Sequence, residues 1–322
     1  MLDDPVLWND WHPVARASEI PPGAVRSAKL LGLDLVVWRN GESVLVWQDL
    51  CVHRGAKLSG GKVVDDCLVC PYHGWTYGSD GNCVRMPAHP TLKPPTRARA
   101  IPYQAKERYD LVWVCLGAPE KEIPFYPEWD DPTFRSFPAG PYPMRASGPR
   151  VIENFLDVAH FPFVHAGYLG DPAHTEIEDY EVESSLDGIT ARDIGVWQPD
   201  PDGSGKPARV GYDYEVLRPL TARFSKVQGD KIFTMIDIVA PVTQTESVAW
   251  PILSINYDAG IPDARFREFQ DVITAQDVPV VESQRPELLP LDLQAELHLR
   301  SDRTAIAYRQ WLRTLGLKFG TA

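Results

Sequence analysis

Two short segments of the chain each combine a cysteine with a histidine. The first reads CVH at 51–53 and the second CPYH at 70–73, with 16 residues between them. Two Cys and two His can hold Zn²⁺ tetrahedrally, or a [2Fe–2S] centre in which the cysteines bind one iron and the histidines the other. In structural zinc sites two cysteines are commonly close in sequence, and so are two histidines, whereas here each cysteine is close to a histidine. The spacing therefore favours the iron–sulfur centre, with the candidate ligands Cys51, His53, Cys70 and His73.

A rival interpretation joins Cys67 to Cys70 as a C-x-x-C redox pair. No βαβ pattern surrounds this pair, and Cys70 is better used together with His73. We expect Cys67 to be a small buried residue on a strand that leads into the loop. Glycines after both Cys–His segments permit tight turns whose N–H groups can point at sulfur, namely Gly55, Gly60, Gly61, Gly74 and Gly78.

A second group of chemistry-bearing residues forms the pattern N-x-x-D-x-x-H-x4-H. Asn154, Asp157 and His160 step by three along a helix expected over 150–159, which keeps them near one face. Pro162 disfavours helix at the residue before it, so the chain can turn and bring His165 back toward His160. Two imidazoles need a carboxylate to complete the facial triad that holds Fe(II) with open positions for O₂. Asp157 is the candidate carboxylate that is near in sequence.

The two Cys–His segments lie within residues 5–118, which are predicted to form an all-β domain. The segment 30–47 contains two β-branched and aromatic runs around an Asn40-Gly41 turn, which predicts a hairpin. Further strand signals lie at 67–69, 74–77 and 109–116. The Pro-rich segment 119–143 reads as an irregular connection to a second domain.

The second domain, 119–322, is predicted to be α+β. Runs between 189 and 258 alternate in the manner of antiparallel strands. Apolar residues near helical spacing predict helices over 265–282 and 291–315, with Gly316 as a stop. We interpret Arg150 and Glu153 as solvated helix residues.

Composition excludes several classes of protein. The 322 residues carry a net charge of −12, so a footprint for nucleic-acid phosphate is absent from the sequence. The 5 cysteines form an odd set in a fairly large chain, which favours a reducing compartment over a disulfide framework. No apolar run approaches the roughly 18 residues of a spanning helix, and the N-terminus opens with two acids rather than the basic start of a secretory signal. We expect a cytoplasmic protein that engages neither membrane nor nucleic acid.

With these residues in place, the chain resembles the Rieske non-haem iron oxygenases. The resemblance is carried by CVHRGAKLSGG, CPYHGWTYGSDG, ERYDLVWVCLG and the D-x-x-H-x4-H segment, and it runs from Trp8 to about Leu315. Neither cluster loop has the extra cysteine of respiratory Rieske proteins, which points to the low-potential type of cluster. A length of 322 residues is similar to the monooxygenase branch, with dicamba and vanillate O-demethylases and saxitoxin-pathway hydroxylases. The resemblance implies an N-terminal all-β Rieske [2Fe–2S] domain followed by a catalytic domain with an antiparallel-sheet helix-grip (START/Bet v1-like) fold.

The resemblance also implies roles for single residues. In this family the third iron ligand lies far downstream, after an acidic or amide residue and five residues before a Glu, and Asp277 between Gln276 and Glu282 matches this pattern. Asp271, Asp292 and Asp302 are rivals for this role. Asp157 becomes a bridge between metal centres, bonded to His160 of its own chain and His73 of the next subunit in a homotrimer. We expect Asn154 and Asp157 to act in catalysis, with His160, His165 and Asp277 as metal ligands.

The implied function is that of a terminal oxygenase component. It would use O₂, the [2Fe–2S] cluster and mononuclear Fe(II) to hydroxylate or oxidatively O- or N-demethylate a small aromatic or heterocyclic molecule. No nucleotide-binding motif is present, so NAD(P)H would act only indirectly, through a flavin/iron–sulfur reductase with or without a ferredoxin. Candidate pocket residues are Phe233, Met235, Trp250 and Ile255. The alternatives are a non-catalytic Rieske-type electron carrier with an appended small-molecule-binding domain, and a zinc-binding interaction module.

Overall fold

The computed structural model describes residues 4–41, 43–257 and 260–322. It divides the chain into two compact units, an N-terminal unit Pro5–Ile123 and a C-terminal unit Pro124–Ala322. The sequence placed this division after residue 118. The segment that follows the last strand still belongs to the N-terminal unit, because the Trp11 indole donates a hydrogen bond to the Lys121 carbonyl at 3.1 Å. The predicted features at residues 1–3, Glu42 and Asp258 lie outside the described residues.

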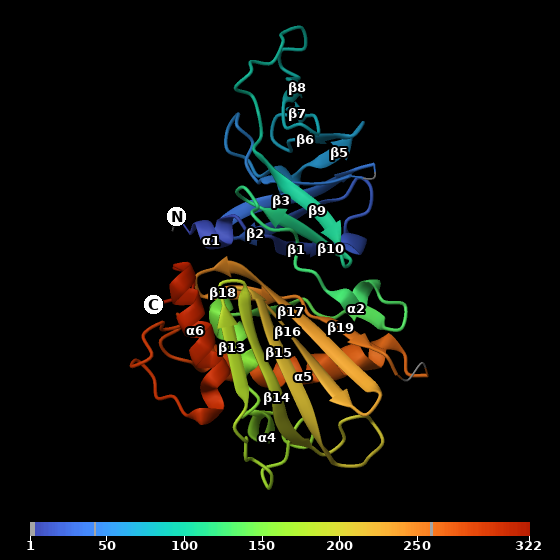
Figure 1. Ribbon diagram of the computed structural model, residues 1–322. Coiled ribbons are helices and arrows are strands. Elements are labelled where there is room, and N and C mark those ends of the chain that lie inside the picture. Colours follow the sequence, from blue (N-terminus) through green and yellow to red (C-terminus); the bar gives the residue numbers. More distant parts are fainter. Residues whose placement is uncertain (1–3, 42, 258–259) are drawn as a thin grey trace. The chain divides into compact units, whose positions relative to one another are not determined.

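The N-terminal unit consists of two antiparallel sheets (Figure 1). The larger has the order β1-β10-β9-β4-β3-β2, with bounds β1 (His12–Arg16), β2 (Val25–Leu30), β3 (Leu33–Asn40), β4 (Ser43–Gln48), β9 (Pro102–Arg108) and β10 (Leu111–Cys115). The smaller has the order β5-β6-β7-β8, with bounds β5 (Lys62–Val64), β6 (Cys67–Val69), β7 (Thr76–Tyr77) and β8 (Cys83–Arg85). The described residues of the unit also form the short helical turns α1 (Pro5–Trp8), η1 (Ala17–Glu19) and η2 (Leu58–Gly60).

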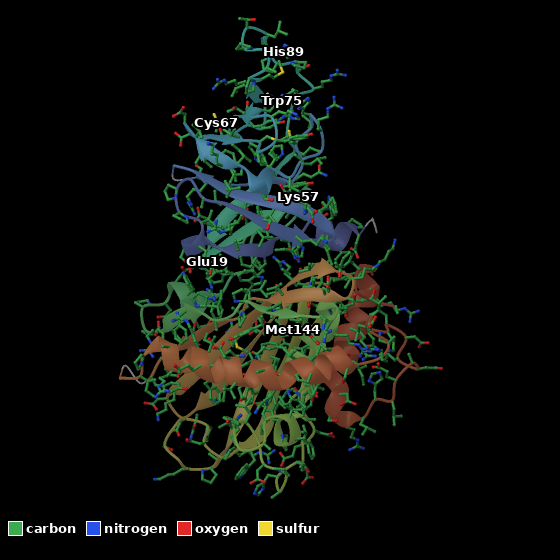
Figure 2. The ribbon with its side chains drawn as sticks, turned by 180° about the vertical axis from the view of Figure 1, so that it is seen from behind. Glu19, Lys57, Cys67, Trp75, His89 and Met144 are labelled. Carbon is green, nitrogen blue, oxygen red and sulfur yellow. The ribbon has the colours of Figure 1, made fainter. Side chains whose placement is uncertain are left out.

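The core of this unit explains how the two Cys–His segments are held. β3 and β4 form the predicted hairpin, and their aromatic residues Trp38 and Trp47 pack edge to face at 4.9 Å between ring centroids. Leu68 and Tyr77 of the smaller sheet join the same buried cluster, which also contains Cys51 and Cys70. Figure 2 shows Cys67 and Trp75 in the smaller-sheet part of the unit, at the opposite end from Glu19. Cys67 is half-buried rather than buried as predicted.

The C-terminal unit is built on a nine-stranded antiparallel sheet. Its main path is β11-β19-β17-β16-β15-β14-β13, while β12 pairs with β18 and β18 with β17. The strands are β11 (Arg135–Pro138), β12 (Tyr142–Met144), β13 (Glu181–Ser185), β14 (Gly188–Gln198), β15 (Ala208–Arg218), β16 (Thr221–Gln228), β17 (Lys231–Thr243), β18 (Glu246–Ala249) and β19 (Ile252–Ile255). The helices are α2 (Pro127–Asp130), α3 (Gly148–Leu156), α4 (Phe161–Val164), α5 (Asp263–Ser283), η3 (Arg300–Asp302) and α6 (Arg303–Leu315).

Helices cover one face of this sheet. α3 packs against β16, β17 and β18 and also contacts α5 and α6, while α6 packs against β13 and β14. Figure 2 shows the long helix α5 running across the sheet. This helix-over-sheet arrangement confirms the one that the family resemblance implied.

Two predicted segments differ from the structure. The Pro-rich segment 119–143 is not wholly irregular, because β11 pairs with β19 and β12 with β18 in the sheet of the C-terminal unit. Each of these strands has a single partner, and such edge positions tolerate proline because one side of the strand needs no donors.

The predicted helix over 291–315 starts only at Arg303. The Asp302 carboxylate accepts the Leu299 N–H at 2.7 Å and so closes the turn that precedes the helix. At the other end the helix stops as predicted, at Gly316 with φ +76°. In the part of the chain that the structure describes, no helix is long and apolar enough to cross a membrane.

Candidate active site

The two Cys–His loops of the N-terminal unit have the same local backbone shape. In each, the cysteine N–H donates to the carbonyl five residues on, and the glycine four residues on donates back to the cysteine carbonyl. The pairs are Cys51–Ala56 at 2.8 Å and Gly55–Cys51 at 2.9 Å, then Cys70–Trp75 at 2.8 Å and Gly74–Cys70 at 3.1 Å. Both glycines have positive φ, +71° and +67°, a conformation that favours glycine. The repeated turn buries both cysteines to 2% exposure.

The side chains of these loops converge. The Cys51 and Cys70 thiols contact each other, and backbone N–H groups of the second loop point at the Cys70 sulfur. The His53 and His73 rings lie 4.7 Å apart between centroids, and His53 stacks on Trp75. His53 Nδ1 is buried without a hydrogen-bond partner among the described residues.

This donor set fits the predicted cluster. Burial raises the pKa of the Cys70 thiol, so the pocket favours an uncharged sulfur until a cation compensates the thiolate. Cys51 Sγ also lies 3.1 Å from the Tyr77 hydroxyl, a group able to hydrogen-bond a sulfur ligand. Two sulfurs and two imidazoles on neighbouring loops are the ligands that a Rieske-type [2Fe–2S] centre requires.

The second predicted group lies in the C-terminal unit, but not on one continuous helix. α3 ends at Leu156, and the Asp157 carboxylate accepts the Ala159 N–H at 2.7 Å in a turn that breaks the helix. A new single turn, α4, starts at Phe161 with Pro162 in its first turn, where proline is tolerated. The helix predicted over 150–159 therefore ends early, at Leu156, and Asp157 and His160 do not lie on it, because the chain turns before Pro162 rather than at it.

The turn and α4 nevertheless bring the two histidines together. His160 Nε2 and His165 Nε2 are 3.2 Å apart. Asp277 Oδ1, from α5, lies 3.4 Å from the first nitrogen and 3.1 Å from the second. The three rival carboxylates bond elsewhere: Asp271 to the Tyr142 hydroxyl at 2.6 Å, Asp292 to the Gln294 N–H at 3.0 Å, and Asp302 to the Leu299 N–H at 2.7 Å.

The remaining nitrogen of each histidine is also held. His160 Nδ1 lies 3.3 Å from Asp157 Oδ2, and His165 Nδ1 lies 2.8 Å from Gln276 Oε1. These contacts fix both rings with Nε2 toward Asp277, as metal-ligating histidines require. Gln276 was used only as part of the pattern around Asp277, and its contact with His165 was not predicted, because no sequence spacing relates an amide on this helix to a histidine more than a hundred residues earlier.

The charges around this triad favour a cation. Burial lowers the pKa of His160, but the carboxylates of Asp157 and Asp277 outweigh it and raise the pKa to about 9. Burial raises the pKa of Asp277, but the imidazoles of His160 and His165 outweigh burial and hold the pKa below its ordinary value. Two imidazoles and one carboxylate fit Fe(II) with open positions, and a bound cation would replace the ring proton of His160.

Arg150 and Glu153, predicted to be solvated, are buried in a network of charged groups. Arg309 of α6 donates to Glu153 Oε1 at 2.5 Å and Oε2 at 2.8 Å, and also bonds Glu296. Arg150 in turn donates to Glu296 Oε1 at 2.7 Å. The prediction was wrong because these partners lie more than a hundred residues away in the sequence. The network ties α3, which leads into Asp157, to α6.

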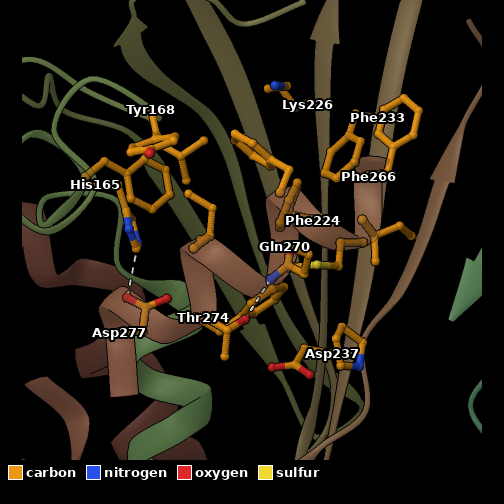
Figure 3. A pocket seen from close by; sticks show the side chains of 18 of the residues that line it. His165, Tyr168, Phe224, Lys226, Phe233, Asp237, Phe266, Gln270, Thr274 and Asp277 are labelled. Atoms are coloured by element: carbon orange, nitrogen blue, oxygen red, sulfur yellow. Dashed lines mark hydrogen bonds and ion pairs between the residues drawn. The ribbon is translucent and has the colours of Figure 1, made fainter. Parts of the chain in front are cut away.

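A cavity of about 380 Å³ adjoins the triad. Aromatic side chains from the sheet and from α5 dominate its wall: Tyr212, Tyr214, Phe224, Phe233, Phe266 and Phe269. Figure 3 shows His165 and Asp277 on one side of it and Phe233 and Phe266 on the other. Asn154 lines the cavity from α3. Of the four candidate pocket residues, Phe233 and Met235 line it, whereas Trp250 and Ile255 are buried outside its wall.

Comparisons with known proteins match both units. Residues 10–96 match the family model of the Rieske [2Fe-2S] domain, and residues 144–317 match that of the vanillate O-demethylase oxygenase C-terminal domain. The methylxanthine N1-demethylase NdmA of Pseudomonas putida is 32% identical over 317 residues, which is 95% of this chain and 88% of that protein. The methylxanthine N3-demethylase NdmB of the same species is 30% identical over 335 residues, 98% of this chain and 91% of that protein.

Two further similarities concern the fold and electron supply. The solved structure of Pseudomonas putida NdmA with caffeine superimposes with a TM-score of 0.84 at 30% identity, covering 96% of this chain and 90% of that one. A stretch of 116 residues, 35% of this chain, is 39% identical to the oxidoreductase NdmD of Pseudomonas putida and covers 20% of that protein.

Proposed function

The chain belongs to the Rieske non-haem iron oxygenases, and from this premise we propose that it oxidatively N-demethylates a small heterocycle. The observation that carries the proposal is the aromatic-walled cavity of about 380 Å³ that reaches His160, His165 and Asp277. Aromatic walls suit a flat heteroaromatic ring, which they can stack against. NdmA and NdmB, which match nearly the whole chain, are named for demethylating methylxanthines.

Family membership gives the general activity. The chain is the terminal oxygenase component, a monooxygenase that uses O₂, a Rieske [2Fe–2S] cluster and non-haem iron on a small molecule. Its electrons come from NAD(P)H only indirectly, through a reductase partner. A non-catalytic electron carrier does not account for the match of residues 144–317 to an oxygenase domain, and a zinc module does not account for the Rieske match.

The ligand roles of single residues are part of the proposal. Cys51, Cys70, His53 and His73 would hold the cluster, and His160, His165 and Asp277 would hold the mononuclear iron. The bound iron centres supply activation of O₂ with electrons delivered one at a time. Around them, Asp157 and Gln276 keep the imidazoles oriented, and aromatic side chains line the space beside the triad. Asn154 presents an amide to the cavity, where it can orient the substrate.

The proposed reaction removes an N-methyl group as formaldehyde. One C–H bond of an N-methyl group becomes C–OH with one atom of O₂, and the other atom leaves as water with two electrons and two protons. The N–CH₂OH group then breaks at its C–N bond and gives N–H and formaldehyde. The carbon that is hydroxylated is the one whose C–H bond the cavity holds beside His160, His165 and Asp277.

We also propose a homotrimer in which Asp157 connects subunits. The side chain of Asp157 is 39% exposed although one oxygen contacts His160, and His73 is exposed in its own loop. Both groups can therefore meet a partner chain, as a bridge between the cluster of one subunit and the iron of the next requires. A cyclic interface of this kind closes into a ring.

The electron route and the compartment complete the proposal. A flavin/iron–sulfur reductase, with or without a ferredoxin, would deliver the electrons. All five cysteines are free, as suits the reducing cytoplasm in which we place the chain.

The metal centres can be tested by composition. Anaerobically purified protein should hold three irons and two acid-labile sulfides per chain, and no zinc. The His160→Ala/His165→Ala double variant should hold two irons and the same sulfide. Two irons in both proteins would contradict the ligand assignment.

The reaction can be tested by stoichiometry. With a surrogate reductase and an N-methylated purine, formaldehyde, demethylated product and consumed O₂ should appear in equal amounts, and the double variant should release no formaldehyde. A hydroxylated product that keeps all its methyl groups would refute N-demethylation while leaving the oxygenase assignment intact.

A further inference from the structure

A single carboxyl group interrupts the apolar wall of the cavity. On β17, alternate residues face the cavity, and these are Phe233, Met235 and Asp237. Asp237 is only 7% exposed, yet it lines the cavity. Figure 3 shows its carboxyl among the cavity side chains, on the same side as Thr274 and away from Lys226.

The protein leaves this carboxyl largely unsatisfied. The Ile238 backbone N–H donates to it, but Oδ1 is buried without a hydrogen-bond partner among the described residues. Lys226 and Arg265 also line the cavity, but Lys226 bonds the Pro201 carbonyl at 2.8 Å and Arg265 bonds Glu268 at 2.9 Å. Burial raises the pKa of Asp237 to about 7, and the charge of Asp277 adds to the shift.

An unsatisfied carboxyl in an apolar wall is unfavourable for folding. Burying a polar group without a partner costs about 1–3 kcal/mol in proteins, and an apolar side chain would fill the position better. The neighbouring inward positions, Phe233 and Met235, show that the strand accepts large apolar residues there. The free oxygen of Asp237 therefore has its use in the bound state, when a ligand supplies the missing partner.

The geometry points to Asp237 as the group that recognises a ring N–H of the substrate. We infer that the substrate is an N-methylated heterocycle that keeps one N–H beside a ring carbonyl, and this inference rests on the proposed N-demethylation. An ionised carboxylate accepts the N–H, and a protonated one accepts the N–H and donates to the neighbouring carbonyl. Such a contact turns the ring in the cavity and so selects which methyl group faces His160, His165 and Asp277.

The contact with Asp237 also discriminates between rings by their methylation. A fully N-methylated ring offers no N–H, and binding it would leave Oδ1 of Asp237 unpaired. The preferred substrate is thus a ring that carries no methyl group at the nitrogen facing Asp237, whether that nitrogen was never methylated or has already lost its methyl group.

Binding of a matched pair of purines tests the inference. Theobromine keeps a ring N–H between two carbonyls where caffeine carries a methyl group, and the two are otherwise identical. Isothermal titration calorimetry on the iron-loaded protein should give at least about tenfold tighter binding of theobromine. Asp237→Leu should abolish this preference, while Asp237→Asn, whose amide also donates and accepts, should keep part of it. Glu183→Gln, which removes an exposed carboxylate on β13, should leave the preference unchanged.

The outcomes separate the inference from the proposed function. Equal affinity for both purines, an unchanged preference in Asp237→Leu, or binding of neither purine would overturn the inference. Formaldehyde released from either purine, together with equal affinities, would support N-demethylation and refute the role of Asp237. Selective, Asp237-dependent binding without formaldehyde would support the recognition and refute the reaction.

Discussion

Removing the buried guanidinium of Arg309 should weaken the part of the C-terminal unit that supports the metal triad. Arg309 is 2% exposed and makes two hydrogen bonds to Glu153, at 2.5 and 2.8 Å, as well as one to Glu296. In Arg309→Met, Glu153 keeps only the long 3.5 Å contact with Arg150. Breaking a buried pair by removing one partner costs about 3–5 kcal/mol. Because Glu296 is half-exposed and can regain water, we expect about 3 kcal/mol.

Native-state hydrogen exchange on peptides from α3 and α6 measures this free energy where it is lost. Arg309→Met/Glu153→Gln should recover part of the loss, because the double variant no longer buries an uncompensated charge. Arg313→Met, on the exposed side of the same helix, is the matched control and should stay within about 0.5 kcal/mol of the wild type. An Arg309→Met variant as protected as this control would refute the reasoning.

Three further results are expected. Asp157→Asn should keep both the cluster and the mononuclear iron but lose most turnover; full activity would rule out the bridging role. Gln276→Leu, which frees His165 Nδ1, should weaken iron binding by about 10- to 100-fold in a chelator competition, with wild-type affinity as the contrary result. The pKa of the Asp237 carboxyl is about 7 in the folded protein, against an ordinary value of 3.8. Between about pH 4 and pH 7 the carboxyl is therefore ionised in the unfolded chain but protonated in the folded one, so the free energy of unfolding falls as the pH rises. Relative to Asp237→Leu, the wild type should therefore gain about 2 kcal/mol of unfolding free energy between pH 7 and pH 5 in urea titrations, and parallel pH profiles would show that Asp237 is solvated.

Features that depend on neighbouring residues could be predicted from the sequence. The shape of the Cys–His loops follows from residues within each loop, because a glycine four residues after each cysteine allows the turn that buries the sulfur. The hairpin of β3 and β4 and the extent of α5 likewise follow from local turn chemistry and periodicity. Asp277 needed the family pattern, because no local spacing relates it to His160.

Features that depend on distant partners could not be predicted in this way. Arg150 and Glu153 read as surface residues because Arg309 and Glu296, which pair with them, come from the far end of the chain. The strands β11 and β12 were not predicted because each contains a proline, Pro138 and Pro143, which only a position with a single partner strand makes tolerable.

Two buried carboxyls of the C-terminal unit show how the same residue class serves two purposes. Glu153 is fully compensated, with both oxygens bonded to Arg309, so its burial stabilises the packing of α3 on α6. Asp237 has no such partner on any described residue, and its free oxygen belongs to the wall of a cavity rather than to the packed core. A scaffold group is satisfied before a ligand arrives, whereas a recognition group is satisfied only when the ligand is bound. On this criterion the charged network between α3 and α6 supports the segment that carries His160 and His165, and Asp237 selects the molecule that binds beside them.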